Sequence, residues 1–397
     1  MKILQIAPQI PVPPNNGARL SIYGITKYLA LRGHEINFAC YNKKKTTNEQ
    51  IQMLSSSSRP FVYETQTDNN AIDAAVNIFS NVPYNISKFE KKEFASKIKE
   101  LIVQNKFDVI HIDHLHMAWL VDNMREITDA PVVLREHNLE MEIMKRFHEY
   151  TKNPLLKKYA EIQYKKFLKY EPHFCEKFDT CVMISAHDEL KLKSLNQNVR
   201  TKVIPAGVMP ELLRLEKSRV EEESIAFLGS LEWFPNLDGI SWFIESVMPM
   251  LKEVRPNIKL YLYGGGVPNN FFIPSFLREN IIVKGFVDDI WNEILKTELV
   301  IVPLRVGSGI RVKILELLAA GQNIVASSIA AEGIPVENEK HILIADSAME
   351  FTDKIDRFLN HRFDNAAMIR NGKELIASNF TWERIAEQFE QLYMSLQ

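Results

Sequence analysis

Short apolar runs alternate with amphipathic stretches in the first half of the chain. The runs are too short for helices and read as buried strands, whereas residues 18–32 carry Ile22, Ile25 and Leu29 at helical spacing. A strand, a helix and a second strand in this order form a βαβ unit, the opening of a doubly wound parallel sheet. The pattern predicts strands at 2–7, 35–40, 107–112, 131–134, 180–185 and 203–205.

The second half repeats this order after a polar stretch at 207–223, which we take as a linker. A helix is predicted over 236–251 with Asn236 as its cap, and a capped terminal helix over 381–396. The polar residues 41–105 are assigned to loops and helices over the first sheet. Two successive Rossmann-like α/β domains follow from the alternation, with strands of the second at 224–228, 259–263, 281–284 and 299–303.

Composition excludes several classes of protein. The chain has 397 residues, a formal net charge of −2 and 46% hydrophobic residues, as expected for two globular domains with no general attraction to nucleic acid. Three cysteines without metal-ligand spacing favour a reducing compartment. We expect neither a signal peptide, because prolines interrupt the apolar N-terminal run, nor a membrane-spanning segment.

Residues 299–321 carry the features of an anion site. An apolar run ends at Pro303, the loop Gly307-Ser308-Gly309 follows, and a helical segment then runs to Gly321. Arg311 and Lys313 fall in the first helical turn, where free N–H groups and the helix dipole disfavour cations unless an anion binds there. The segment is therefore either a phosphate site or an ordinary βα connection with solvated charges.

Polar clusters follow two of the predicted strands. Asp113-His114-Leu115-His116 comes after 107–112, and Arg135 to Glu140, which includes His137, comes after 131–134. In open α/β sheets, ligands bind beyond the carboxyl ends of the strands. Each histidine alone is more easily explained as structural, but together the clusters indicate a site.

Residues 144–177 form a long helical segment with many lysines among leucine, phenylalanine and tyrosine residues. One interpretation is a solvated face whose lysines lie along apolar surface. The other is peripheral contact with anionic lipid headgroups, which basic and aromatic residues together suit. Interleaved acids, among them Glu161 and Glu171, weaken the second interpretation.

The stretch from Pro303 to Gly321 resembles the signature of family 4 (group 1) glycosyltransferases, retaining enzymes of the GT-B fold. Glu316 followed by Leu-Leu-Ala-Ala-Gly matches the second acidic residue of their motif and the small-residue stretch after it. The resemblance extends to Asn16-Gly17 and Arg32-Gly33-His34. This chain has Ser308 at the position of the first acidic residue, and residues 229–236 lack the lysine that the family has near the phosphates.

The resemblance implies two Rossmann-like domains that face each other across a cleft. Residues 1–206 would bind the acceptor and 207–378 the nucleotide-sugar donor, and 379–397 would form a helix that packs back on the first domain. It implies a nucleotide-diphosphate sugar as substrate, with no cofactor and no metal. The implied donor-binding residues are Gly17, Gly229, Val287, Arg305, Ser308, Gly309, Ile310, Arg311, Lys313 and Glu316, and the candidate catalytic residues are Asp113, His114, His137 and Glu140.

The expected function is transfer of a hexosyl unit, with retention, from a nucleotide-diphosphate sugar to an acceptor hydroxyl in surface polysaccharide or glycolipid biosynthesis. The acceptor would be a polysaccharide or lipid-linked glycan, and the enzyme would be cytoplasmic or peripheral at the inner membrane face, without a nucleic-acid partner. Two alternatives are a sugar-nucleotide epimerase of the same fold and a catalytically degenerate sugar-nucleotide-binding protein.

Overall fold

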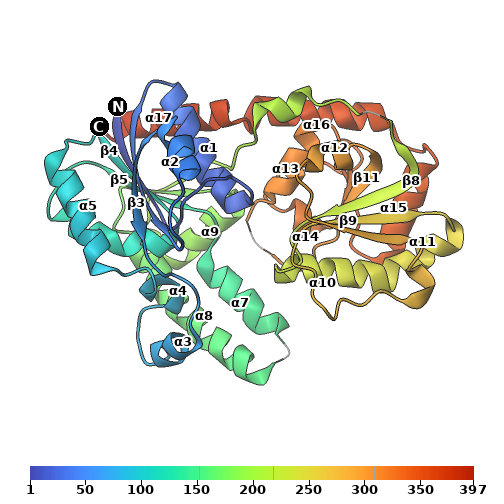
Figure 1. Ribbon diagram of the computed structural model, residues 1–397, viewed down its shortest axis with the longest axis horizontal. Helices are drawn as coiled ribbons and strands as arrows, with labels where there is room; N and C mark the ends of the chain where they lie inside the picture. The colour runs from blue at the N-terminus through green and yellow to red at the C-terminus, as the bar shows by residue number, and fades with distance from the viewer. Residues whose placement is uncertain (152, 218, 308) are drawn as a thin grey trace. The chain divides into compact units, whose positions relative to one another are not determined.

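The computed structural model describes residues 1–151, 153–217, 219–307 and 309–397. The chain divides into two compact units (Figure 1): unit 1 comprises Met1–Gly207 and Trp382–Gln397, and unit 2 comprises Val208–Thr381. The division at Gly207 and Val208 lies next to the predicted boundary after residue 206. The second division lies three residues after the predicted end of the donor domain at 378, and the last helix belongs to unit 1.

Unit 1 is built on a parallel sheet that, within the described residues, has seven strands in the order β3-β2-β1-β4-β5-β6-β7. Six strands match predicted ones, but β3 falls in the region assigned to loops and helices. β3 is an edge strand and contains Pro60, which is tolerated there because its missing N–H can face outward. The strands are β1 Lys2–Ala7, β2 Glu35–Asn42, β3 Arg59–Glu64, β4 Val109–Asp113, β5 Val132–Glu136, β6 Thr180–Met183 and β7 Thr201–Val203.

Helices cover both faces of this sheet (Figure 1). Leu4, Ile110 and Leu134 point to one face of the sheet and pack with α5 and α8. The residues next to them in each strand point to the opposite face, which α1 and α17 cover. The helical elements of unit 1 are α1 Gly17–Leu31, α2 Asn48–Ser55, α3 Ala71–Asn77, α4 Tyr84–Ser87, α5 Lys92–Gln104, η1 Leu115–Leu120, α6 Val121–Arg125, α7 Glu140–Tyr150, α8 Pro154–Cys175, α9 Ala186–Leu195 and α17 Trp382–Ser395.

The prediction of one continuous helix over 144–177 was wrong, because α7 and α8 are separate. Asn153 caps α8, since its side chain accepts hydrogen bonds from the N–H groups of Leu155 and Leu156, and Pro154 follows at the first helical position. An asparagine cap followed by proline is a strong helix start.

Unit 2 repeats the architecture with a parallel sheet in the order β10-β9-β8-β11-β12-β13. The strands are β8 Glu221–Leu228, β9 Lys259–Tyr263, β10 Ile281–Gly285, β11 Thr297–Val302, β12 Asn323–Ala326 and β13 Leu343–Ile344. The helical elements are η2 Pro210–Arg214, α10 Phe234–Trp242, η3 Phe243–Val247, α11 Met248–Val254, η4 Ser275–Leu277, α12 Ile290–Ile294, α13 Val312–Ala319, α14 Ser328–Ala331, α15 Ala348–Leu359 and α16 Asn365–Asn379. Its core lies between the sheet and the helices α11 and α15.

The predicted helix 236–251 needs correction. α10 begins at Phe234, a π-helical turn (η3) follows it, and α11 then continues to Val254. Asn236 lies inside α10 and is not the cap. Its buried side chain instead takes part in the site described below.

Candidate functional site

The predicted catalytic residues of unit 1 lie at the carboxyl ends of β4 and β5. Asp113 is the last residue of β4, His137 directly follows β5, and Glu140 is the first residue of α7. The paired register sets Asp113 beside Arg135 in the sheet. The structure therefore brings the four predicted catalytic residues, of which His114 is the fourth, to one edge of the sheet.

Asp113 lies beneath this edge, with a relative exposure of 0%. Its carboxylate accepts hydrogen bonds from Gln5 Nε2 at 2.7 Å and His137 Nε2 at 3.1 Å, and it lies 3.5 Å from Arg135 and 3.4 Å from His111. Burial alone would raise the pKa of Asp113, but His111, His137 and Arg135 outweigh it and hold the pKa well below its ordinary value. Asp113 is thus an enclosed anion whose partners leave it no exposed surface.

His137 receives its orientation from this anion. An ionised carboxylate only accepts hydrogen bonds, so we assign the ring proton of His137 to Nε2 and the free lone pair to Nδ1. Burial lowers the pKa of His137 to about 4, although the hydrogen bond to Asp113 opposes this. The imidazole is therefore neutral at pH 7 and presents an acceptor nitrogen.

His114 holds the other side of the His137 ring. The two rings stack with centroids 3.7 Å apart and planes 17° apart. His114 has a φ of 68°, which is unfavourable for a side chain with a Cβ, and its N–H donates to the carbonyl of Arg135 at 2.9 Å. Strain of this kind persists where the surrounding structure enforces it, often at functional sites.

A second polar layer connects the cluster to α1 and α17. His111 Nδ1 is hydrogen-bonded to the hydroxyl of Tyr393, and the fully buried Arg135 donates to the carbonyl of Ser21 at 3.1 Å and to its hydroxyl at 2.9 Å. Tyr393 belongs to the last helix of the chain. The C-terminal helix is thereby part of the support behind His137.

A carboxyl group with a raised pKa lies near the histidines. Burial raises the pKa of Glu140 to about 7, and its Oε1 lies 3.7 Å from His116 Nε2. Burial lowers the pKa of His116 to about 3. The carboxylate of Glu171 accepts the N–H groups of Glu140 and Met141 at 2.8 and 2.9 Å and so fixes the start of α7. Glu140 can therefore gain or lose a proton near neutral pH.

In unit 2, Gly307 and Gly309 of the glycine loop before α13 lie in the left-handed region, with φ values of 145° and 73°. Arg311 folds back over this loop: its guanidinium donates to the carbonyl of Gly309, and a Cβ on Gly307 would lie 2.5 Å from Arg311 Nη2. Arg311 stands at the cap position rather than inside the helix, and Ile310 is buried beside it. The predicted Ser308 lies outside the described residues.

Lys313 reaches from α13 to the end of β8. Its Nζ donates to the carbonyl of Leu228 at 2.8 Å and to Asn236 Oδ1 at 2.9 Å. A Cβ on Gly229 would lie 2.8 Å from this ammonium, so the glycine leaves the space that Lys313 occupies. Burial, followed by the charge of Arg311, lowers the pKa of Lys313 to about 7. A cation held in this way would be stabilised by an arriving anion.

Glu316 is half-buried one turn further along α13, and burial raises its pKa to about 7, although the charge of Lys313 opposes this. Arg305 is more exposed; its Nε lies 3.9 Å from Asp238 Oδ2. Val287 is half-buried just after β10. Gly17 is the exposed first residue of α1 in unit 1, where a Cβ would meet nothing within 4 Å.

The structure adds residues that the sequence did not reveal. Asn236 could have been suspected only as a cap, and Tyr393 and Glu171 lie in helices whose spacing gives no sign of a polar role. Among the described residues, no group of three or more His, Cys, Asp or Glu side chains could hold a metal ion. No described helix is long and apolar enough to cross a membrane.

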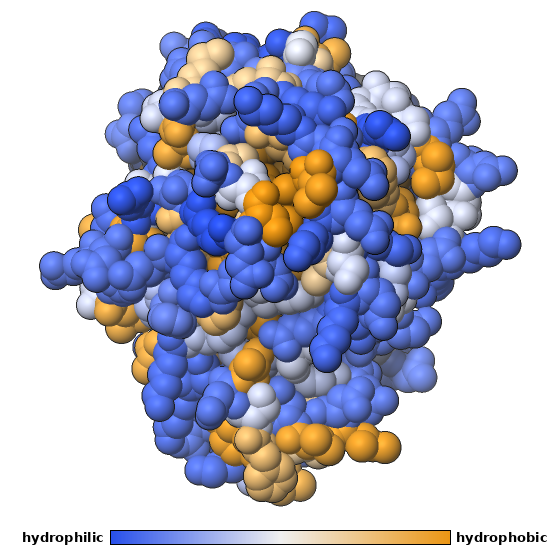
Figure 2. Space-filling view, turned by 90° about the vertical axis from the view of Figure 1, so that its left-hand side faces the viewer, coloured by the Kyte–Doolittle hydropathy of each residue, from blue (hydrophilic) through white to orange (hydrophobic). Residues whose placement is uncertain are grey.

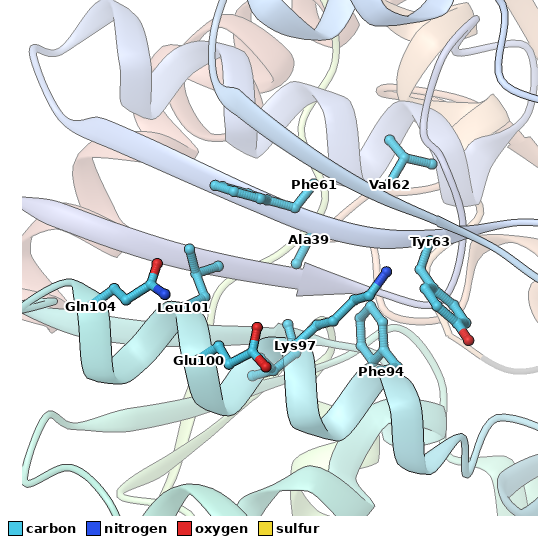
Figure 3. Close-up of a pocket in the computed structure, with 10 residues that line it drawn as sticks. Ala39, Phe61, Val62, Tyr63, Phe94, Lys97, Glu100, Leu101 and Gln104 are labelled. Carbon is cyan, nitrogen blue, oxygen red and sulfur yellow. The ribbon is translucent and has the colours of Figure 1, made fainter.

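A separate cavity of about 310 Å³ lies between β3 and α5 (Figure 3). Phe61 and Tyr63 of the edge strand, with Phe94, Lys97 and Leu101 of the helix, contribute to its wall. None of the predicted site residues that the structure describes lines it. We therefore do not assign it to the candidate site.

Comparison with solved structures shows the fold. Sucrose-phosphate synthase from Thermosynechococcus elongatus aligns with a TM-score of 0.72 at 17% identity over 100% of this chain and 99% of that chain. Anabaena Alr3699/HepE in complex with UDP aligns with a TM-score of 0.68 at 13% identity over 100% of both. A mutant of TarM from S. aureus, in complex with Fondaparinux, alpha-GlcNAc-glycerol and UDP, aligns with a TM-score of 0.70 at 12% identity over 99% of both.

Sequence comparison shows the family. An uncharacterized protein in the cps region of Klebsiella pneumoniae is 21% identical over 396 residues, 97% of each chain. Residues 15–212 match the model of Glycosyltransferase Family 4, and residues 222–361 match that of Glycosyl transferases group 1. The predicted family and two-domain α/β architecture are thereby confirmed: the chain belongs to the family 4, group 1 glycosyltransferases and has the GT-B fold.

Proposed function

We propose that this glycosyltransferase moves a hexosyl unit, with retention, from a nucleotide-diphosphate sugar to an acceptor hydroxyl in surface polysaccharide or glycolipid synthesis. The observation that carries the donor side is the group formed by Arg311, Lys313 and the glycine loop at the end of the unit 2 sheet. Two supports come from similar proteins: HepE was crystallised with UDP and UDP-glucose, and the Klebsiella relative lies in the cps region.

In this proposal, unit 2 binds the donor. Arg311, Lys313 and the N–H groups at the start of α13 meet the negative charge of the diphosphate, which grows as the bond to the sugar breaks. Glu316 accepts hydrogen bonds from the ribose hydroxyls. The base lies along Gly264 and the segment after β10, where Phe286 is largely exposed. We assign no cofactor or metal, because these residues supply the positive charge.

Unit 1 binds the acceptor in this proposal. The bond between the anomeric carbon and the diphosphate oxygen breaks, and the acceptor oxygen bonds to the same face of that carbon, which retains the configuration. The acceptor proton passes to the departing phosphate oxygen. His137 Nδ1 and the carboxyl group of Glu140 orient hydroxyl groups during this step, whereas the enclosed Asp113 acts by positioning His137.

The decisive experiment measures the release of nucleoside diphosphate from UDP-, GDP- and ADP-sugars, with the donor first identified by thermal shift. Release that depends on an acceptor supports transfer. Conversion to an epimeric sugar nucleotide would instead show an epimerase. Donor binding with neither transfer nor hydrolysis would show a degenerate binding protein, an alternative favoured by Ser308 and by the absence of a lysine in 229–236.

The donor site itself is tested by the double variant Arg311→Ala with Lys313→Ala. Loss of both cations should weaken nucleoside diphosphate binding, and added salt should weaken the wild type more than the variant, because salt screens the charge interaction. Equal affinity and equal salt dependence in the two proteins would place the diphosphate elsewhere. We further propose that the enzyme works at the inner face of a membrane, as a peripheral protein.

A further inference from the structure

Unit 1 carries an exposed apolar and basic surface at the end formed by α3 and the start of α8. We define this tip surface by Ile72, Val76 and Phe79 on one side and by Leu155, Leu156 and the lysines of α8 on the other. Phe79 is 92% exposed, Leu155 is 81% exposed and Ile72 is 74% exposed. Single exposed side chains of this kind are common, but several gathered at one end of a domain mark an interaction or membrane site.

The two sides of the tip surface are joined by a partly buried polar connection. Lys166 Nζ donates to the carbonyl of Asn77 and lies 3.0 Å from Asn77 Oδ1, and Gln163 Nε2 donates to that oxygen at 3.1 Å. Gln163 Oε1 also accepts the N–H of Tyr84 at 2.9 Å. α3 is thus fixed to α8 and does not present its apolar residues as a separate flexible segment.

The charge on the two long helices is strongly positive at the surface. The basic residues of α7 and α8 are Lys145, Arg146, Lys157, Lys158, Lys165, Lys166 and Lys169, and none of them is buried. Of the acidic residues, Glu140, Glu142 and Glu171 are buried, which leaves Glu149 and Glu161. Some of the acids that weaken the lipid interpretation in the sequence are therefore inside the protein. On α3, Asp73 is the one charged residue.

Large apolar side chains are exposed at the same end of unit 1 as these basic residues. Figure 2 shows orange and tan side chains next to one another at the lower edge of the view, with blue side chains around them; Figure 1 draws α3 and the start of α8 at this end. Exposed apolar side chains next to a helix with exposed lysines suit the boundary of a bilayer, where the apolar groups enter the acyl region and the lysines meet anionic headgroups.

We propose that the tip surface docks unit 1 onto an anionic lipid bilayer. The exposed apolar residues of α3, together with Phe79 and Leu155, enter the headgroup boundary, and the exposed lysines of α8 contact lipid phosphates. This inference names the part of the molecule that would hold the enzyme at the membrane, and it does not depend on which sugar is transferred. Membrane binding requires both the inserted apolar side chains and the lysine charges, because either one alone gives only weak attachment to a bilayer.

The test is co-sedimentation of the full chain with vesicles of phosphatidylcholine, with and without phosphatidylglycerol. The charge variant is Lys157→Glu with Lys158→Glu, and the matched control is Lys92→Glu with Lys99→Glu on α5, where neither lysine is buried. Lys157 and Lys158 are exposed near the N-terminal end of α8, so the variant should fold. The apolar variant is Phe79→Ser. Its control is Val103→Ser on α5, because this valine is 70% exposed and lies outside the tip surface.

We expect wild-type protein to sediment with phosphatidylglycerol vesicles and to be released by salt. The charge variant should bind at least about 25-fold more weakly, from about fivefold per lysine, and Phe79→Ser should also bind more weakly. Both controls should bind like the wild type, and all variants should keep wild-type affinity for nucleoside diphosphate.

Three results would overturn the proposal. The first is a wild-type protein that does not sediment with anionic vesicles. The second is an α5 charge control that loses as much vesicle binding as the charge variant. The third is a Phe79→Ser variant that alters only the self-association of the protein in solution. The last result would make the surface a contact between protein chains. Failure of the donor site to bind a nucleotide would leave these outcomes unchanged, so the two proposals can fail separately.

Discussion

Replacing Lys313 by arginine should remove a pH dependence that the lysine gives to donor binding. In the free protein the pKa of Lys313 is lowered to about 7 by burial and by the neighbouring Arg311. A bound diphosphate places negative charge beside the ammonium and raises its pKa toward the ordinary value of about 10.4. Arginine stays charged throughout the accessible pH range.

The size of the effect follows from these values. Above pH 7 the free lysine is increasingly neutral, so binding must include uptake of one proton. Each further pH unit then costs about 1.4 kcal/mol, which is a tenfold increase in Kd. Between about pH 7 and pH 9, the Kd of the wild type should therefore rise roughly fiftyfold relative to the Kd of Lys313→Arg.

The assay is isothermal titration of both proteins with the nucleoside diphosphate that gives the largest thermal shift. The phosphate itself titrates near pH 6 and so keeps its charge over this range. Glu316, whose pKa is raised to about 7, titrates in both proteins, so the ratio of the two Kd values isolates Lys313. A ratio that does not change with pH would refute the placement of the diphosphate beside Lys313.

Three further changes test the rest of the site. Glu316→Ala should weaken donor binding by about 1.5–3 kcal/mol, the value of hydrogen bonds to a charged group, and leave the melting temperature unchanged; wild-type affinity in titration would exclude the ribose contact. Asp113→Asn should cost about 3–5 kcal/mol in urea unfolding at neutral pH, because Arg135 stays buried without its counter-charge. Since the folded pKa of Asp113 is depressed, the wild type should lose this stability as pH falls below about 4, and a variant as stable as the wild type at neutral pH would contradict the network. Tyr393→Phe should slow transfer without changing donor affinity, because it removes the partner of His111; an unchanged rate would show that α17 does not support His137.

The periodic elements were predictable from sequence because local pattern decides them. β1 and β9 lie where the apolar runs predicted them, since buried parallel strands read as continuous apolar segments. β3 was not predicted because Pro60 and the charged residues at its ends interrupt the continuous apolar run that marks a buried strand. The break before α8 was missed because lysines on both sides hid the Asn153-Pro154 start.

The candidate site was predictable in its residue types but not in their arrangement. Alternation along β4 could place Asp113 on a face of the sheet, but only the tertiary structure shows that α1 and α17 cover that face. The depressed pKa of Lys313 likewise depends on burial against β8, which lies 85 residues earlier in the chain. Contacts of this kind come from packing between distant segments, which single-sequence periodicity does not contain.

The discontinuous course of unit 1 affects how the protein must be made. Trp382, Phe389 and Tyr393 are fully buried in this unit, and the Trp382 ring occupies the space beside Gly24 and Gly207. During synthesis, the N-terminal strands and helices emerge long before these side chains exist. The N-terminal part of unit 1 therefore keeps an apolar face exposed while unit 2 is translated. This face is covered only after α17 has left the ribosome.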